Sequence, residues 1–134
     1  MVEFGFKDRS ESVYRKLQIL IAEGLTPIVA HPERYAFVAE NGSAPLMLKK
    51  IGCLLQLNKG SLKNKFGDNA YAVSQALIIG EIADFVASDA HSPYVRTPYL
   101  ADVREIIIDL HSEQHADLLL STNPEKILKN EKLQ

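Results

Sequence analysis

The chain has 134 residues, which predicts a single domain over residues 1–134. Its 17 acidic and 15 basic side chains give a formal net charge of -2, so nucleic acid and anionic membrane surfaces are not expected partners. A single cysteine excludes an internal disulfide and a cysteine-rich zinc site. No apolar run approaches the roughly 20 residues of a membrane helix, and no signal-peptide pattern is present, so we expect a soluble, cytoplasmic protein without membrane insertion.

The first elements are predicted to be a strand end, a helix and a strand. Val2-Glu3-Phe4 resembles the tail of a strand. Asp8 followed by Glu11 has the spacing of a capping box, and the helix it opens ends at Gly24. An apolar run over 27–30 then predicts a strand.

The next elements continue this alternation. A helix is expected from Ser43, with Pro45 in its first turn, to Gly52, and the apolar run over 53–57 predicts a second strand. Lys59, Lys63 and Lys65 follow in what reads as a small basic, solvated loop.

The last third repeats the pattern. A helix is expected after Asp68 and Asn69, ending before Gly80, and then a strand over 85–87 and a helix opened by Thr97-Pro98. Residues 111–120 either extend that helix or form another, and Asn123-Pro124 is predicted to cap and open the last helix.

The spacing of the apolar runs indicates the fold class. The runs begin at positions 27, 53 and 85, so successive starts are 26 and 32 residues apart, which fits one helix plus turns between neighbouring strands. None of the runs alternates clearly, as expected of strands buried on both faces of a parallel sheet. The sequence therefore predicts an α/β fold of about four parallel strands alternating with helices. Such a sheet has two unprotected edges, which favours part of a larger β/α fold or self-association.

Polar side chains capable of chemistry follow the expected strands, where parallel β/α folds place their sites. These residues are Glu3, His31, Asn58, Asp89 and His91. The Glu, His, Asp and His side chains form a ligand set suited to Mn²⁺, Zn²⁺ or Fe²⁺, which can activate water and polarise a phosphoryl oxygen.

Two arginines near these candidate metal ligands could bind a phosphate group. Arg34 follows His31 by three residues and Arg96 follows His91 by five, and arginine holds phosphate through paired hydrogen bonds. Metal ligands beside two arginines indicate a phosphoesterase. Taken singly, such residues are more often a turn residue, a cap or a solvated charge, so it is their coincidence at strand ends that carries the prediction.

The other reactive residues fit simpler interpretations. His111 and His115 lack the glutamate of a His-Glu-x-x-His zinc site and read as a solvated helix face. Cys53 begins an apolar run and reads as inert core.

Several segments that contain the candidate site residues resemble a known superfamily. The segments over 28–35, 57–62, 87–91 with Arg96, and 122–124 are similar to the polymerase and histidinol phosphatase (PHP) superfamily. Within it, they most resemble the bacterial manganese-dependent protein-tyrosine phosphatases of capsule and exopolysaccharide synthesis.

The resemblance implies a distorted (β/α)7 barrel with metal ions at the carboxyl rim. Glu3, His31, Asp89 and His91 would be metal ligands, with Mn²⁺ the expected ion and Zn²⁺ or Fe²⁺ as alternatives. Arg34 and Arg96 would hold the substrate phosphate, which a metal-activated water attacks in line. The implied substrate is a phosphotyrosine protein, with a bacterial tyrosine kinase as one candidate.

The sequence departs from this family at its beginning. The family opens with a His-x-His motif, an Asp-Asp-Gly segment and further ligands before the glutamate matched by Glu3, and this chain matches only the C-terminal portion of the barrel. A half-barrel would expose core faces and strand edges, so we expect a homo-oligomer. Two alternatives stay open: an inactive fragment that only folds and associates, and a phosphatase for a small metabolite such as histidinol phosphate.

Overall fold

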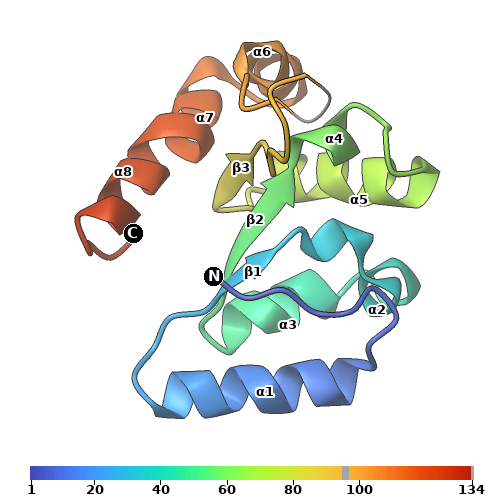
Figure 1. The fold of residues 1–134 in the computed structure, drawn as a ribbon, viewed down its shortest axis with the longest axis vertical. Coiled ribbons are helices and arrows are strands. Elements are labelled where there is room, and N and C mark those ends of the chain that lie inside the picture. The colour runs from blue at the N-terminus through green and yellow to red at the C-terminus, as the bar shows by residue number, and fades with distance from the viewer. Residues whose placement is uncertain (95–96, 134) are drawn as a thin grey trace.

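A small parallel sheet lies at the centre of the molecule, which we describe from a computed structural model covering residues 1–94 and 97–133. Its strands β1 (Ile28–Ala30), β2 (Leu54–Asn58) and β3 (Phe85–Ala87) pair in the order β1-β2-β3 (Figure 1). Val2 adds one parallel bridge to β1, donating its N–H to the Ile28 carbonyl at 2.8 Å. The predicted parallel α/β arrangement is confirmed, with the expected fourth strand reduced to this bridge.

Helices follow each strand and lie on either side of the sheet in Figure 1. They are α1 (Ser10–Ala22), the 3-10 turn η1 (Pro32–Arg34), α2 (Ala36–Glu40), α3 (Ala44–Lys50), α4 (Lys59–Leu62), α5 (Asp68–Ile79), α6 (Ala101–Leu110), α7 (Glu113–Asp117), the π-helical turn η2 (Leu118–Thr122) and α8 (Asn123–Leu128). In Figure 1, α1 lies at one end of the molecule and α6 at the other, with the strands between them. Across the described ranges, no helix combines the length and the apolar character that a bilayer crossing requires.

The predicted capping box of the first helix is wrong. The residue before α1 is Arg9, and it makes no side-chain cap. The Asp8 carboxylate instead accepts the N–H of Gly5 at 3.2 Å, so it orders the preceding turn. The predicted helix itself, with Val13 and Leu17 fully buried, is confirmed.

The start predicted for the fourth helix is wrong, because a lysine binds backbone carbonyls of the preceding segment. The ammonium of Lys59 donates to the Thr97 carbonyl at 2.7 Å and also to the carbonyl of Tyr99. Helix α6 therefore starts only at Ala101. Lys59 itself begins helix α4, so the expected basic loop is wrong at this residue. Lys63 and Lys65 follow the helix and are exposed, as expected, with Lys63 paired to Asp102.

The C-terminal helices form a nearly continuous rod. Residues 111–120 leave α6 and form α7 and η2, and α8 follows without a break. Asn123 is therefore inside a helical run, and its side chain donates to the Asp84 carbonyl at 2.8 Å. The predicted N-cap at Asn123 is wrong because this tertiary contact takes its side chain.

The core lies against one face of the sheet. Val29, Leu55, Leu57 and Val86 share that face and are almost fully buried under the helices. On the opposite face, Ala30 and Phe85 are buried, whereas Ile28, Leu54, Gln56 and Ala87 are only half-buried. A cleft of about 370 Å³ separates part of it from α8. The expectation of burial on both faces is therefore wrong for the part of this second face that borders the cleft.

His115 belongs to the core, which corrects its expected place on a solvated face. It is 6% exposed, and its Nε2 atom has no hydrogen-bond partner among the described residues. Its ring lies 4.4 Å from that of His111, which is exposed and whose Nε2 pairs with a Glu81 carboxylate oxygen at 3.0 Å. Burial, followed by the charge of His111, lowers the pKa of His115.

This burial predicts that replacing His115 by leucine makes stability less dependent on pH. As pH falls through about 6.5, the unfolded chain binds a proton at His115 that the folded chain binds only at lower pH. The free energy of unfolding of the wild type therefore decreases as the pH is lowered. This part of the pH dependence disappears in His115→Leu, which has no imidazole to protonate. Urea unfolding from neutral to mildly acidic pH measures the two slopes. Equal slopes would contradict the assignment.

Candidate functional site

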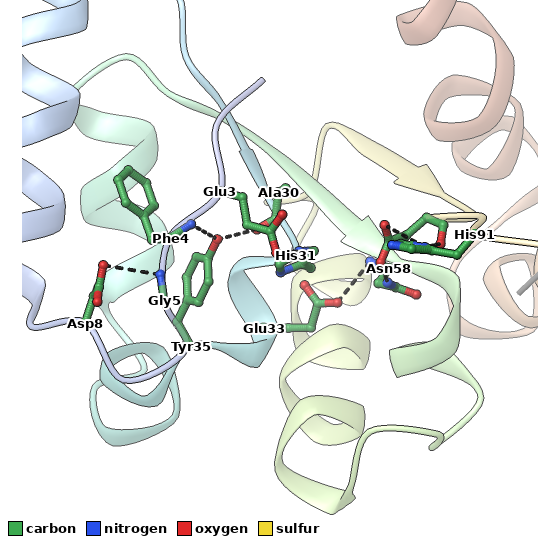
Figure 2. A network of polar contacts seen from close by, with 11 residues as sticks. Glu3, Phe4, Gly5, Asp8, Ala30, His31, Glu33, Tyr35, Asn58 and His91 are labelled. Atoms are coloured by element: carbon green, nitrogen blue, oxygen red, sulfur yellow. Dashed lines mark hydrogen bonds and ion pairs between the residues drawn. The ribbon is translucent and has the colours of Figure 1, made fainter.

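The carboxyl ends of the parallel strands bring the predicted site residues to one rim (Figure 2). They meet there in two pairs. Glu3, beside the Val2 bridge, places a carboxylate oxygen 3.0 Å from Nε2 of His31, which follows β1. Asn58, the last residue of β2, donates from its side chain to Asp89, beyond β3, at 2.8 Å. The prediction that strand ends collect these side chains is supported by this geometry.

His31 is held in an unusual backbone conformation. Its φ of 36° lies in the left-handed region, which a non-glycine residue adopts at a cost. Its N–H donates to the Gln56 carbonyl at 2.7 Å, which fixes the turn against β2. The residue is 4% exposed, and its Nδ1 atom has no hydrogen-bond partner in the described part of the chain. A strained, buried histidine with an unused nitrogen is consistent with a ligand-binding role.

Asp89 and His91 form the other half of the rim. Asp89 also has a positive φ, 47°. The His91 Nδ1 atom lies 2.7 Å from the Asp89 carbonyl and 3.8 Å from one of its carboxylate oxygens. The hydrogen bond from Asn58 fixes the other carboxylate oxygen, the kind of contact that orients a ligand side chain.

Glu33 is a buried carboxyl that the sequence reading did not single out. It is 1% exposed and lies between the two pairs in Figure 2. One of its oxygens accepts the backbone N–H of Asn58 at 2.9 Å and the hydroxyl of Ser61 at 2.6 Å. Burial raises the pKa of Glu33 to about 7. This side chain joins the end of β1 to the end of β2.

Tyr35 fastens the segment that carries Glu3. Its hydroxyl donates to the Ala30 carbonyl at 2.9 Å and accepts the N–H of Phe4 at 3.1 Å. The ring is fully buried, and burial raises the pKa of its hydroxyl to about 12, so the phenol stays protonated. Tyr35 therefore sets where Glu3 meets His31.

The two predicted phosphate-binding arginines differ in what can be said of them. Arg34 ends η1, beside the rim, with its guanidinium 4.3 Å from the centre of the Phe6 ring and 4.0 Å from that of Phe66. Arg96 lies outside the described residues.

The donor chemistry of the rim fits a divalent cation in part. Carboxylate oxygens and imidazole nitrogens suit Mn²⁺, Zn²⁺ and Fe²⁺, and the unused Nδ1 of His31 is a spare donor. Over residues 1–94 and 97–133, however, no three His, Cys, Asp or Glu side chains come together closely enough to hold one ion. Cys53 takes no part, since it is buried and burial raises its pKa to about 11, as expected of inert core.

The fold and this rim define a class of protein, a parallel α/β protein whose polar side chains gather at the carboxyl ends of its strands. The family model for capsular polysaccharide synthesis, CpsB/CapC, matches residues 1–129. The chain belongs to this family, which confirms the predicted relationship to capsule-synthesis phosphatases.

Individual proteins similar to this chain are named as tyrosine-protein phosphatases. The chain is 29% identical over 135 residues to the tyrosine-protein phosphatase CpsB of Streptococcus agalactiae, covering 97% of this chain and 56% of that protein. It is 32% identical over 136 residues to the tyrosine-protein phosphatase YwqE of Bacillus subtilis, covering 98% and 51%. The chain therefore spans about half the length of these relatives.

A solved structure matches the fold. It comes from a study of YwqE from Bacillus subtilis and CpsB from Streptococcus pneumoniae, described as unique metal-dependent tyrosine phosphatases. The TM-score is 0.88 at 28% identity, and the match covers 100% of this chain and 54% of the other. The predicted relation to this barrel type is confirmed over the length of the chain.

Proposed function

We propose that this chain contributes the rim of a metal-dependent phosphatase that acts on phosphotyrosine in proteins. The observation that carries the proposal is the meeting of Glu3 with His31, and of Asp89 with His91, at one rim beside Arg34. Membership in the CpsB/CapC family supports it.

Each rim residue has a role in this proposal. Glu3, His31, Asp89 and His91 hold divalent metal, with Mn²⁺ first and Zn²⁺ or Fe²⁺ as alternatives. Arg34 and Arg96 bind the phosphate oxygens. A divalent ion bound at such a rim supplies a more acidic water and polarises a phosphoryl oxygen. The protein's part is to fix the ligands, through Asn58 and Tyr35, and to present cationic hydrogen-bond donors to the phosphate.

The cellular setting is proposed with it. The substrate is a phosphotyrosine protein, with a bacterial tyrosine kinase as a candidate, and the protein works in the cytoplasm as a homo-oligomer. The half-buried second face of the sheet, with Ile28 and Gln56, is consistent with such an association.

Hydrolysis of a phosphotyrosine peptide by the purified chain, with and without Mn²⁺, tests the function. We expect phosphate release that depends on Mn²⁺. We also expect Arg34→Ala to lower kcat/KM by about tenfold to a hundredfold, because hydrogen bonds to charged groups contribute about 1.5–3 kcal/mol.

Two controls separate this function from the alternatives. Histidinol phosphate in the same assay should be the poorer substrate, and faster turnover of it would replace the protein substrate by a small metabolite. Arg34→Ala should keep its Mn²⁺, since arginine serves the anion. No turnover by the wild-type chain with or without Mn²⁺ would leave an inactive fragment as the better description.

A further inference from the structure

The guanidinium of Arg34 is enclosed between two aromatic rings. The Phe6 ring centre lies 4.3 Å from Cζ of Arg34, and the Phe66 ring centre lies 4.0 Å from it. Both distances are well within the roughly 6 Å over which a cation is attracted to a ring. Phe6 precedes α1 and Phe66 lies between α4 and α5, so two distant segments of the chain close on one side chain.

This enclosure leaves the edge of the guanidinium available. In the part of the chain that the structure describes, Arg34 makes no side-chain hydrogen bond, and no carboxylate forms an ion pair with it. One oxygen of the adjacent Glu33 carboxyl accepts from Asn58 and Ser61, and the other has no hydrogen-bond partner among the described residues. A guanidinium presents its N–H donors in its own plane, where they match the paired oxygens of a phosphate group. Rings over its surface therefore restrict its motion without competing for those donors.

One of the two rings, Phe6, also connects Arg34 to the rim. The Phe6 ring lies 5.6 Å from the His31 ring, so it contacts a proposed metal ligand and the proposed phosphate-binding arginine together. Phe6, Arg34 and Phe66 also line a cleft of about 360 Å³, together with Lys7 and Asn69. The cleft adds a second cationic side chain to the surroundings of Arg34.

Phe66 can reach this position because of a glycine. A side-chain carbon built on Gly60 would lie 2.5 Å from the Phe66 ring and 3.1 Å from the side-chain oxygen of Asn58. Gly60 lies within α4, where alanine would otherwise be the better helix former. Its lack of a side chain allows the ring to approach the backbone closely.

We propose that Phe6 and Phe66 are positioning residues, an aromatic clamp that holds Arg34 with its N–H edge ready for the phosphate group of the substrate. The proposal rests on the proposed function, which assigns Arg34 to the phosphate. An arginine ordered before binding loses less side-chain entropy when the phosphate arrives, so the clamp raises phosphate affinity and lowers KM.

Phosphate binding by matched variants tests the clamp. Isothermal titration of inorganic phosphate into the Mn²⁺-loaded chain is compared for wild type, Phe66→Leu, Phe66→Tyr and Arg34→Ala. We expect Phe66→Leu to weaken phosphate binding by about fivefold and to raise KM more than it changes kcat, because one cation–π contact is lost. Phe66→Tyr keeps a ring over the guanidinium and should restore wild-type affinity. Bound Mn²⁺ should be the same in all four proteins.

The outcomes separate failure of the clamp from failure of the proposed function. Weak binding in Arg34→Ala with normal binding in Phe66→Leu would overturn the clamp and leave the role of Arg34 intact. Normal binding in Arg34→Ala, or none in the wild type, would overturn both.

A second variant guards against loss of packing at Phe66. Phe6 is 42% exposed, so Phe6→Leu should keep the fold and still weaken phosphate binding. The Arg34 Nε–H resonance provides a readout without phosphate, since both rings should shift it upfield and each leucine variant should reduce the shift. An unshifted resonance in the wild type would overturn the clamp.

Discussion

Replacing Glu33 by alanine is expected to lower the free energy of unfolding by about 3 kcal/mol or more. Glu33 is almost fully buried and holds the backbone N–H of Asn58 and the hydroxyl of Ser61. Alanine would leave both buried donors without an acceptor, at about 1–3 kcal/mol each, and would open a cavity. Urea unfolding of the two proteins measures the difference.

Glutamine at the same position is the matched control. Glu33→Gln keeps the size of the side chain and an acceptor oxygen for both donors. It should therefore cost about 1 kcal/mol, which covers an amide group placed where the second Glu33 oxygen has no partner. A loss below about 1 kcal/mol in Glu33→Ala, or equal losses in both variants, would show that the carboxyl does not hold the end of β2.

The strands could be predicted because local composition determines them. Continuous apolar runs near Ile28, Leu54 and Phe85 became the three parallel strands. Helix ends were harder, because side chains with capping propensity found other partners. Asp8 turned back to Gly5, and Asn123 reached Asp84 across the molecule. The Asn123 contact joins residues 39 positions apart, so the residues next to Asn123 carry no signature of it.

The part of the site that could be predicted is the part that follows from the direction of the parallel strands. Parallel strands gather the residues at their carboxyl ends, and this rule brings Glu3 beside His31 and Asn58 beside Asp89. The supporting contacts escaped prediction because they join residues far apart in the chain. Glu33 reaches Asn58 and Ser61, and Phe66 reaches Arg34. The only available signal was position, since Glu33 and Tyr35 flank Arg34 within the His-Pro-Glu-Arg-Tyr motif.

The alanine variants His31→Ala and His91→Ala are each expected to weaken Mn²⁺ binding by more than about tenfold, the lower end of what loss of a contact orienting a metal ligand costs. The two histidines differ in burial and in hydrogen-bond partner. His31 is buried against Glu3 with a spare Nδ1, whereas His91 is exposed and held by the Asp89 carbonyl. Calorimetric titration of Mn²⁺ and the metal content after dialysis measure both variants.

His111→Ala is the control that separates ligation from general loss of imidazole. His111 is exposed and pairs with Glu81 through the same kind of carboxylate contact, at 3.0 Å, that Glu3 makes to His31. It lies on the C-terminal helices, away from the strand ends, and should leave Mn²⁺ affinity unchanged. Because His31 is buried, its variant is first checked for a wild-type unfolding transition, and His91→Ala carries the argument independently. Equal metal content in all three variants would overturn the ligand assignment, since only a site at the strand ends distinguishes these histidines.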